Sequence, residues 1–163
     1  MFQYNLLNTK RKRSISAVPA SPADSQDSNS KNILVVEDNL INQQILLRYL
    51  QNAGHFCTVA SNGLEALEQF QKFKFDLIFM DIEMPGMNGL VATQEIRKLE
   101  AGSHRAPVPI VGLSGNARKE QIEAAKAVGM SDYLTKPYHK DDLYKILATH
   151  VEDQTPTKQP RLE

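Results

Sequence analysis

The sequence predicts an α/β fold in which a doubly wound, five-stranded parallel sheet carries helices on both faces. Two observations support this. Five short apolar segments are continuous rather than alternating, which is typical of strands that are covered on both faces. A segment with apolar residues at helical spacing follows each of them. Such β-then-α units, joined by right-handed crossovers, form a parallel sheet.

The expected strands are short and rich in branched aliphatic residues, so each can be buried across its whole width. In chain order they are Ile33–Val36, Cys57–Ala60, Leu77–Met80, Ile110–Leu113 and Tyr133–Thr135.

The expected helices follow from apolar positions that recur at helical spacing and should face the core. In chain order these positions are Ile41, Ile45, Tyr49, Leu50 and Ala53; Leu64, Leu67 and Phe70; Leu90, Val91, Ile96 and Leu99; Ile122, Ala125 and Val128; and Leu143, Ile146, Leu147 and Val151. Asn62, followed three residues later by Glu65, resembles a capping box at the start of the second helix. Gly54 and Gly129 fall where the first and fourth helices should end.

The length of 163 residues suits one domain with flanking segments. Residues 14–30 hold six Ser, two Pro and three Ala, a composition that buries too little apolar surface to fold. We therefore expect a disordered basic and Ser-rich arm or linker over 1–31, one folded domain over 32–151, and a flexible C-terminal tail over 152–163.

Composition excludes several classes of protein. The formal net charge is zero, and residues 32–151 carry 12 basic and 14 acidic groups, so we expect no direct contact with nucleic acid. The basic run at 10–13 is either a nuclear-import or anion-binding patch or a solvated tail. Cys57 is the only cysteine, and no apolar run approaches the roughly 18–20 residues of a membrane span. We expect a cytoplasmic protein without membrane contact, with the nucleus as the other possible compartment.

Polar residues follow four of the expected strands. Glu37 and Asp38 come after the first strand, Asp81 after the third, Ser114 after the fourth and Lys136 after the fifth. Each alone has an ordinary interpretation, such as a helix N-terminus, a turn or a surface lysine. Together they should meet, because parallel strands place their carboxyl ends at one edge, where such sheets bind ligands.

The chemistry of this group favours a divalent cation. Clustered carboxylates repel one another, so their pKa values rise unless a cation lies among them. Oxygen ligands without His or Cys favour Mg²⁺, or Mn²⁺ in its place, over zinc or copper. A carboxylate with a divalent cation, a lysine and a hydroxyl around it is suited to phosphoryl transfer through an acyl phosphate.

Three segments carry a resemblance to a known family. They are Ile33-Leu-Val-Val-Glu-Asp-Asn39, Asp76-Leu-Ile-Phe-Met-Asp-Ile-Glu-Met-Pro-Gly-Met-Asn-Gly89 and Gly129-Met-Ser-Asp-Tyr-Leu-Thr-Lys-Pro137. In this order they resemble the receiver domain of two-component response regulators, over about residues 32–150. The resemblance implies a flavodoxin-like sheet of strand order 2-1-3-4-5. It identifies the folded domain, 32–151, as a receiver domain.

The resemblance also assigns roles around the phosphoacceptor, Asp81. It implies that Asp38 and Asp81 bind Mg²⁺ directly, that Glu37 acts largely through water, and that the Glu83 backbone carbonyl completes the metal shell. It implies that Lys136 pairs with Asp81 and then with phosphoryl oxygens.

The same resemblance implies a conformational switch. Ser114 would move to hydrogen-bond the phosphoryl group, and Tyr133 would turn inward with it. The Lys136–Pro137 bond would be cis. The sequence departs from the commonest family pattern at Glu37, Ser114 and Gly115, where Asp, Thr and Ala are more frequent. Ser114 keeps the hydroxyl, so we expect the signalling chemistry to be retained. Glu83 lies at a position that tunes autodephosphorylation in the family.

A second resemblance concerns the kind of receiver. The segments Glu37-Asp-Asn-Leu-Ile-Asn42 and Val111-Gly-Leu-Ser-Gly-Asn-Ala117 are similar to receivers of hybrid histidine kinases. This implies a histidine phosphotransfer protein or a histidine kinase domain as partner. About 12 residues follow the last expected helix, so we expect no C-terminal DNA-binding domain.

Other classes of function are weighed against this one. A binding-only receiver that docks without phosphorylation, or an output regulator without a DNA-binding domain, are the alternatives. An aspartyl-phosphate phosphatase would need Asp-x-Asp after the first strand, where Glu37-Asp-Asn39 stands. Enzyme status is left open: a receiver catalyses only its own phosphorylation and dephosphorylation, although the chain could belong to a larger hybrid kinase.

Overall fold

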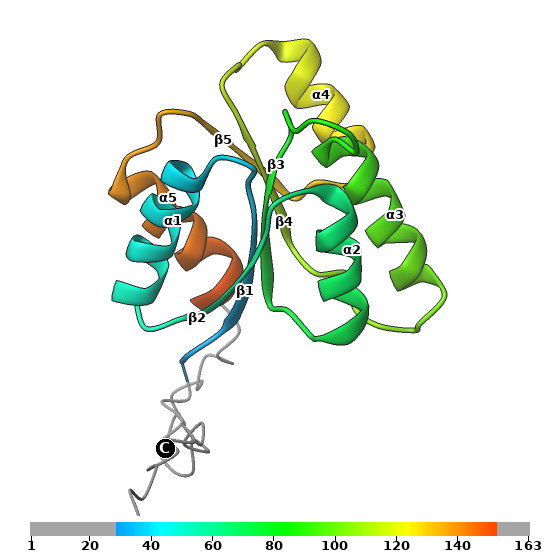
Figure 1. The fold of residues 1–163 in the computed structure, drawn as a ribbon, viewed down its shortest axis with the longest axis horizontal. Helices are drawn as coiled ribbons and strands as arrows, with labels where there is room; N and C mark the ends of the chain where they lie inside the picture. Colours follow the sequence, from blue (N-terminus) through cyan, green and yellow to red (C-terminus); the bar gives the residue numbers. More distant parts are fainter. Residues whose placement is uncertain (1–28, 153–163) are drawn as a thin grey trace, which may run out of the picture.

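A computed structural model describes residues 29–152 of the chain. Strands and helices alternate in the order expected from the sequence (Figure 1). The strands are β1 (Asn32–Val36), β2 (Phe56–Ala60), β3 (Leu77–Asp81), β4 (Ile110–Ser114) and β5 (Asp132–Thr135). The helices are α1 (Leu40–Asn52), α2 (Gly63–Lys72), α3 (Gly89–Ala101), α4 (Lys119–Ala127) and α5 (Lys140–Leu147). A π-helical segment, η1 (Ala148–Glu152), continues from α5.

The strands form one parallel sheet in the order β2-β1-β3-β4-β5, which confirms the predicted fold class and strand order. Helices α1 and α5 cover one face, and α2 and α3 cover the other, with α4 beside α3 (Figure 1). All strands run in the same direction, so their carboxyl ends lie along a single edge of the sheet.

Strand β1 shows why the sheet is buried on both sides. Ile33 and Val35 pack in the cluster that includes residues of α1 and α5, whereas Leu34 and Val36 pack in the cluster that includes residues of α2 and α3. Successive side chains of a strand point to opposite faces, so a continuous apolar run serves both clusters. None of these four side chains is exposed to solvent.

The apolar face expected for α1 was wrong in part. Ile41 and Ile45 are 70% and 41% exposed, and Ala53 is exposed as well. Leu50 is buried as predicted, and the helix also buries Gln43 and Leu46. Ile41 precedes Leu50 by about two and a half helical turns, so the two residues lie on opposite faces. The same correction applies to Leu64 of α2 and to Val91 and Leu99 of α3, which were expected in the core but are exposed.

The C-terminal helix also differs from its prediction. The spacing predicted one helix through Val151, but α5 ends at Leu147 and the chain continues in the wider winding of η1. Val151 is nevertheless buried in the cluster beneath α1 and α5, so the apolar positions themselves were identified correctly.

Capping side chains set where the helices start. Asn39 accepts hydrogen bonds from the backbone N–H groups of Ile41 and Asn42, at 2.9 and 3.2 Å. It therefore caps α1, which begins at the next residue, Leu40. Asn62 accepts from the Glu65 N–H at 2.9 Å, as predicted. The Glu65 carboxylate, however, accepts from the N–H of Ser61 at 2.7 Å, so the box is shifted by one residue.

Two glycines end helices as predicted. Gly54 and Gly129 have φ angles of 88° and 98°, a left-handed conformation that favours glycine and stops a helix. Each therefore turns the chain from a helix toward the next strand.

Most of the predicted arm (1–31) and nearly all of the predicted tail (152–163) lie outside the described residues, so those boundaries stay predictions. Over residues 29–152, no helix combines the length and the apolarity that crossing a bilayer requires.

Candidate functional site

The predicted site residues meet at the carboxyl edge of the sheet. Asp81 and Ser114 are the last residues of β3 and β4, while Glu37 directly follows β1 and Lys136 directly follows β5. Asp81 pairs with Leu113 across the sheet, and Leu113 immediately precedes Ser114. The strand register therefore brings side chains together that are up to 99 residues apart in sequence.

Lys136 bridges two buried carboxylates. Its Nζ lies 2.7 Å from Glu37 Oε2 and 3.1 Å from Asp81 Oδ2. The exposed fractions of the Glu37 and Asp81 side chains are only 1% and 2%. The pairing with Asp81 was expected, but the shorter contact with Glu37 was not.

Residues at the start of α1 hold Glu37 in place. Its Oε1 accepts hydrogen bonds from the backbone N–H of Asn39 at 3.1 Å and from Asn42 Nδ2 at 3.4 Å. Gln43 is buried, and its Nε2 donates to the Glu37 backbone carbonyl at 2.5 Å. Nothing in the sequence singled out Gln43, because a glutamine in a helix is ordinary and its partner is set by the packing of α1 on β1.

Burial and charge act in opposite directions on these groups. Burial, followed by the charge of Glu37, raises the pKa of Asp81 from 3.8 to about 6, against the lowering effect of Lys136. Burial also acts to raise the pKa of Glu37, but its hydrogen bonds with Lys136 and the Asn39 N–H hold that pKa below its usual value. Burial acts to lower the pKa of Lys136, but the two carboxylates raise it overall, so its ammonium group stays charged.

Three carboxylates form a group able to hold a cation. One oxygen from each of Glu37, Asp38 and Asp81 lies within 4.8 Å of the others. Asp38 is exposed, so the group opens to solvent on one side. Hard carboxylate oxygens without nitrogen or sulfur ligands suit Mg²⁺, which keeps several waters in its shell. The donor set therefore fits the predicted ion.

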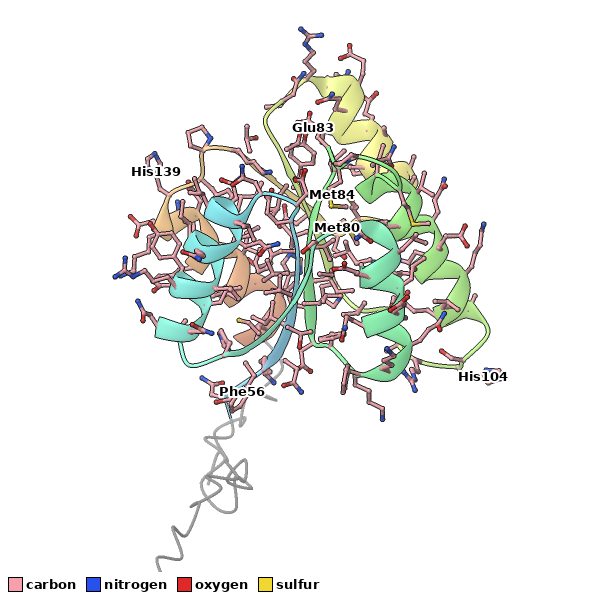
Figure 2. All side chains as sticks on the ribbon, viewed as in Figure 1. Phe56, Met80, Glu83, Met84, His104 and His139 are labelled. Atoms are coloured by element: carbon pink, nitrogen blue, oxygen red, sulfur yellow. The ribbon has the colours of Figure 1, made fainter. Side chains whose placement is uncertain are left out.

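Glu83, on the loop after β3, contacts two residues of the site. Its backbone N–H donates to Asp81 Oδ1 at 3.0 Å, and its side-chain Oε1 accepts a hydrogen bond from Ser114 Oγ at 3.2 Å. Figure 2 shows Glu83 at the end of the sheet near the start of α4. The predicted role of the Glu83 backbone carbonyl as a metal ligand stays a prediction. The side-chain contact with Ser114 was missed, since it depends on a side-chain direction that the sequence does not encode.

Asn116, in the loop after β4, forms hydrogen bonds with both Ser114 and Tyr133. Ser114 Oγ accepts a hydrogen bond from the Asn116 N–H at 3.1 Å, and the Tyr133 hydroxyl donates to the Asn116 backbone carbonyl. The two residues expected to act as a coupled switch thus share one neighbour. The Lys136–Pro137 bond is cis, as expected.

Among the described residues, no histidine or cysteine belongs to the carboxylate group. His104 and His139 are on opposite sides of the molecule (Figure 2). Met80 and Met84 are buried in the cluster that packs against α2 and α3, which is a packing role. Cys57 is a free thiol, and burial raises its pKa to about 11, so it is a weak nucleophile.

Chemically, the arrangement is suited to phosphoryl transfer. A carboxylate such as that of Asp81 can act as a nucleophile, an ammonium group 3.1 Å from it can offset charge on transferring oxygens, and the neighbouring carboxylates can accommodate a divalent cation. The Ser114 hydroxyl lies at the end of the adjacent strand.

Comparisons with known proteins agree with this geometry. Transcription factor SKN7 of Candida albicans is 35% identical over 148 residues, which cover 88% of this chain and 26% of that protein. The receiver domain of the sensor histidine kinase PA1611 from Pseudomonas aeruginosa, solved with magnesium in its active-site cleft, is 35% identical with a TM-score of 0.68 and covers 76% of this chain and 98% of its own.

A third similar structure contains a partner. The receiver domain of the Saccharomyces cerevisiae response regulator Ssk1, solved with the histidine phosphotransfer protein Ypd1, is 35% identical with a TM-score of 0.73, covering 80% of this chain and 94% of its own. The chain spans only 15% to 26% of the length of the first curated relatives that it matches. Residues 33–148 match the family described as the response regulator receiver domain. With the strand order, the acidic group and the bridging lysine in place, the chain belongs to the response regulator receiver family.

Proposed function

We propose that this receiver accepts a phosphoryl group from a phosphohistidine donor onto Asp81 and changes conformation as a result. The observation that carries the proposal is the ion-paired cluster at the sheet edge. There Asp81 lies 3.1 Å from Lys136 and beside Glu37 and Asp38.

The transfer is a displacement at phosphorus. An Asp81 carboxylate oxygen attacks phosphorus, the P–N bond to the donor imidazole breaks, and its electron pair stays on the imidazole nitrogen, which takes up a proton. The products are an acyl phosphate at Asp81 and a neutral imidazole. Lys136, already oriented by Glu37, offsets charge on the transferring oxygens.

Asp38 and Asp81, with Glu37 through water and the Glu83 backbone carbonyl, would hold Mg²⁺. When bound, the ion supplies positive charge that stabilises the phosphoryl oxygens. The magnesium in the PA1611 receiver supports the choice of ion, and Mn²⁺ is proposed only as its replacement.

Ser114 and Tyr133 would report phosphorylation. Ser114 would leave its resting contacts to hydrogen-bond the phosphoryl group, and the shared neighbour Asn116 would transmit this change to Tyr133. The affected surface includes the groove of about 470 Å³ between α4 and β5, one of whose walls is Tyr133.

We propose a histidine phosphotransfer protein as the partner, with a histidine kinase domain as the other candidate donor. Apolar side chains of α1 are unusually exposed for their type: Leu40 at 69%, Ile41 at 70% and Ile45 at 41%. Ile45 also lines a groove of about 300 Å³ that reaches Lys136. A donor docked on α1 would thus place its histidine beside Asp81, and the Ypd1–Ssk1 complex provides a precedent for such a partner.

A hybrid histidine kinase is the origin that we propose from the sequence, and the SKN7 relative shows that similar receivers also occur in transcription factors. The free thiol of Cys57 accords with the reducing compartment that we propose, the cytoplasm or the nucleus.

Phosphorylation can be tested with a small phosphodonor such as acetyl phosphate. Intact mass should increase by one phosphoryl group in the presence of Mg²⁺, and EDTA should abolish the increase. Asp81→Asn should not be labelled, whereas Asp141→Asn, which changes an exposed carboxylate of α5, should be labelled like the wild type. Labelling of Asp81→Asn would show that another residue is the acceptor. A wild type that takes up neither phosphate nor beryllofluoride would favour the binding-only receiver.

A further inference from the structure

The Ser114 hydroxyl already has both a donor and an acceptor in the resting protein. Ser114 is fully buried, and its Oγ accepts a hydrogen bond from the Asn116 N–H at 3.1 Å. Its own proton points to Glu83 Oε1 at 3.2 Å. A serine hydroxyl has a single proton to donate. While it is donated to Glu83, it cannot be donated to an oxygen bound at Asp81.

Glu83 contacts the site through both its backbone and its side chain. Its backbone N–H donates to Asp81 Oδ1 at 3.0 Å, which fixes the start of the loop against the phosphoacceptor. Its side chain then reaches across to the end of β4. The carboxylate is exposed and the hydroxyl is buried, so the acceptor for Ser114 comes from the solvent side of the site.

We propose that the Glu83 carboxylate is a positioning residue that holds Ser114 in the resting arrangement, and that it thereby lowers the fraction of the protein in the switched state. This rests on the function proposed above and adds its regulation. To engage a phosphoryl oxygen, Ser114 must give up the hydrogen bond to Glu83. The hydrogen bond to Glu83 stabilises only the resting state. Any change that removes this acceptor therefore shifts the equilibrium toward the switched state.

Residue 115 does not crowd this contact. A Cβ at position 115 would lie 3.7 Å from Glu83 Oε2, an ordinary van der Waals distance. The hydrogen-bonded chain then continues through Asn116, whose carbonyl accepts from Tyr133. Movement of Ser114 away from Glu83 would therefore reach Tyr133, which lines the α4–β5 groove, through Asn116.

The test is a double-mutant cycle read by the affinity for beryllofluoride with Mg²⁺, a stable analogue of the phosphoryl group. Glu83→Ala should bind beryllofluoride about three- to tenfold more tightly than the wild type, which corresponds to the net contribution of one typical hydrogen bond, because the Glu83 carboxylate is exposed to solvent. Glu83→Gln keeps an oxygen acceptor without the charge, so its gain should be smaller. Glu120→Ala removes an exposed carboxylate of α4 and should leave the affinity unchanged.

Removal of a negative charge near the site would also favour an anionic ligand, independently of Ser114. The cycle separates the two effects. In a Ser114→Ala background the gain from Glu83→Ala should largely disappear, because the hydroxyl that Glu83 holds is absent. An equal gain in both backgrounds would mean that charge alone acts, and it would overturn the proposal, as would the absence of any gain.

A second measurement needs no ligand. In metal-free amide NMR spectra, Glu83→Ala should move the Asn116 resonance toward its position in the beryllofluoride-bound wild type. An unchanged Asn116 resonance would count against the proposal. If Glu83→Ala behaves like the wild type while the wild type binds beryllofluoride and Asp81→Asn does not, only the role of Glu83 is refuted. If the wild type does not bind beryllofluoride, the phosphorylation proposal fails and the role of Glu83 fails with it.

Discussion

Replacing Asp81 by Asn should stabilise the metal-free protein at neutral pH. Asp81 is a carboxylate with only 2% of its side chain exposed, beside the second buried carboxylate of Glu37. Asn has nearly the same shape and keeps an oxygen that can accept the hydrogen bond from the Glu83 N–H. The substitution therefore removes a buried negative charge with little change in packing.

The size of the effect follows from the pKa of Asp81. A rise from 3.8 to about 6 corresponds to roughly 3 kcal/mol of penalty on the charged form, at about 1.36 kcal/mol per pKa unit. Lys136 loses one of its two partners in the variant, which offsets part of this gain. We therefore expect the free energy of unfolding to increase by about 1–3 kcal/mol above about pH 6.

The sign with pH is also determined. The pKa of Asp81 is higher in the folded state than in the unfolded state, so the folded state binds this proton more tightly. The penalty is absent below about pH 4, grows as pH rises to about 6, and is complete above that. The stability advantage of Asp81→Asn should follow the same course.

Urea denaturation in EDTA, followed by circular dichroism at about pH 7.5 and about pH 4.5, measures this advantage directly. Added Mg²⁺ should stabilise the wild type by binding the native state and should reduce the gap to the variant. Equal stabilities at the higher pH, or a gap that does not narrow at the lower pH, would refute the reasoning about buried charge.

Three further substitutions test the site and its supports. Lys136→Met should lower the free energy of unfolding by about 3 kcal/mol, because it leaves two buried carboxylates unpaired, and added Mg²⁺ should restore part of the loss in urea titrations. Gly89→Ala should both destabilise the fold and prevent labelling by acetyl phosphate, because its Cβ would overlap with the Asp81 backbone oxygen. The matched control is Gly115→Ala, whose Cβ would meet only a carboxylate oxygen at 3.7 Å, so this variant should fold and be labelled. Asn39→Ala should cost about 1 kcal/mol in thermal unfolding, because two N–H groups at the start of α1 lose their cap, and an unchanged stability would contradict that role.

The prediction of the fold succeeded where the signal was local. Continuous apolar runs marked the strands, and Asn62, Gly54 and Gly129 marked helix ends, because these features act within a few residues of chain. The apolar face of α1 was harder to predict. Ile41 and Ile45 are as apolar as Leu46 and Leu50, and only the contact with the sheet distinguishes the buried pair from the exposed pair.

The composition of the candidate site was predictable for a related reason. In a parallel sheet the residues after each strand must gather at one edge, so the order of Glu37, Asp81, Ser114 and Lys136 along the chain was enough to bring them together. Which atoms pair within that group depends on side-chain directions and on burial. The 2.7 Å contact between Lys136 and Glu37 joins residues 99 positions apart, and the contact of Ser114 with Glu83 joins the end of β4 to the loop after β3. The parallel sheet and the residue types at its strand ends could thus be inferred from the chain, and the family resemblance implied the strand order. The choice of hydrogen-bond partners arises only when packing removes water from these groups and each must find the best neighbour within reach.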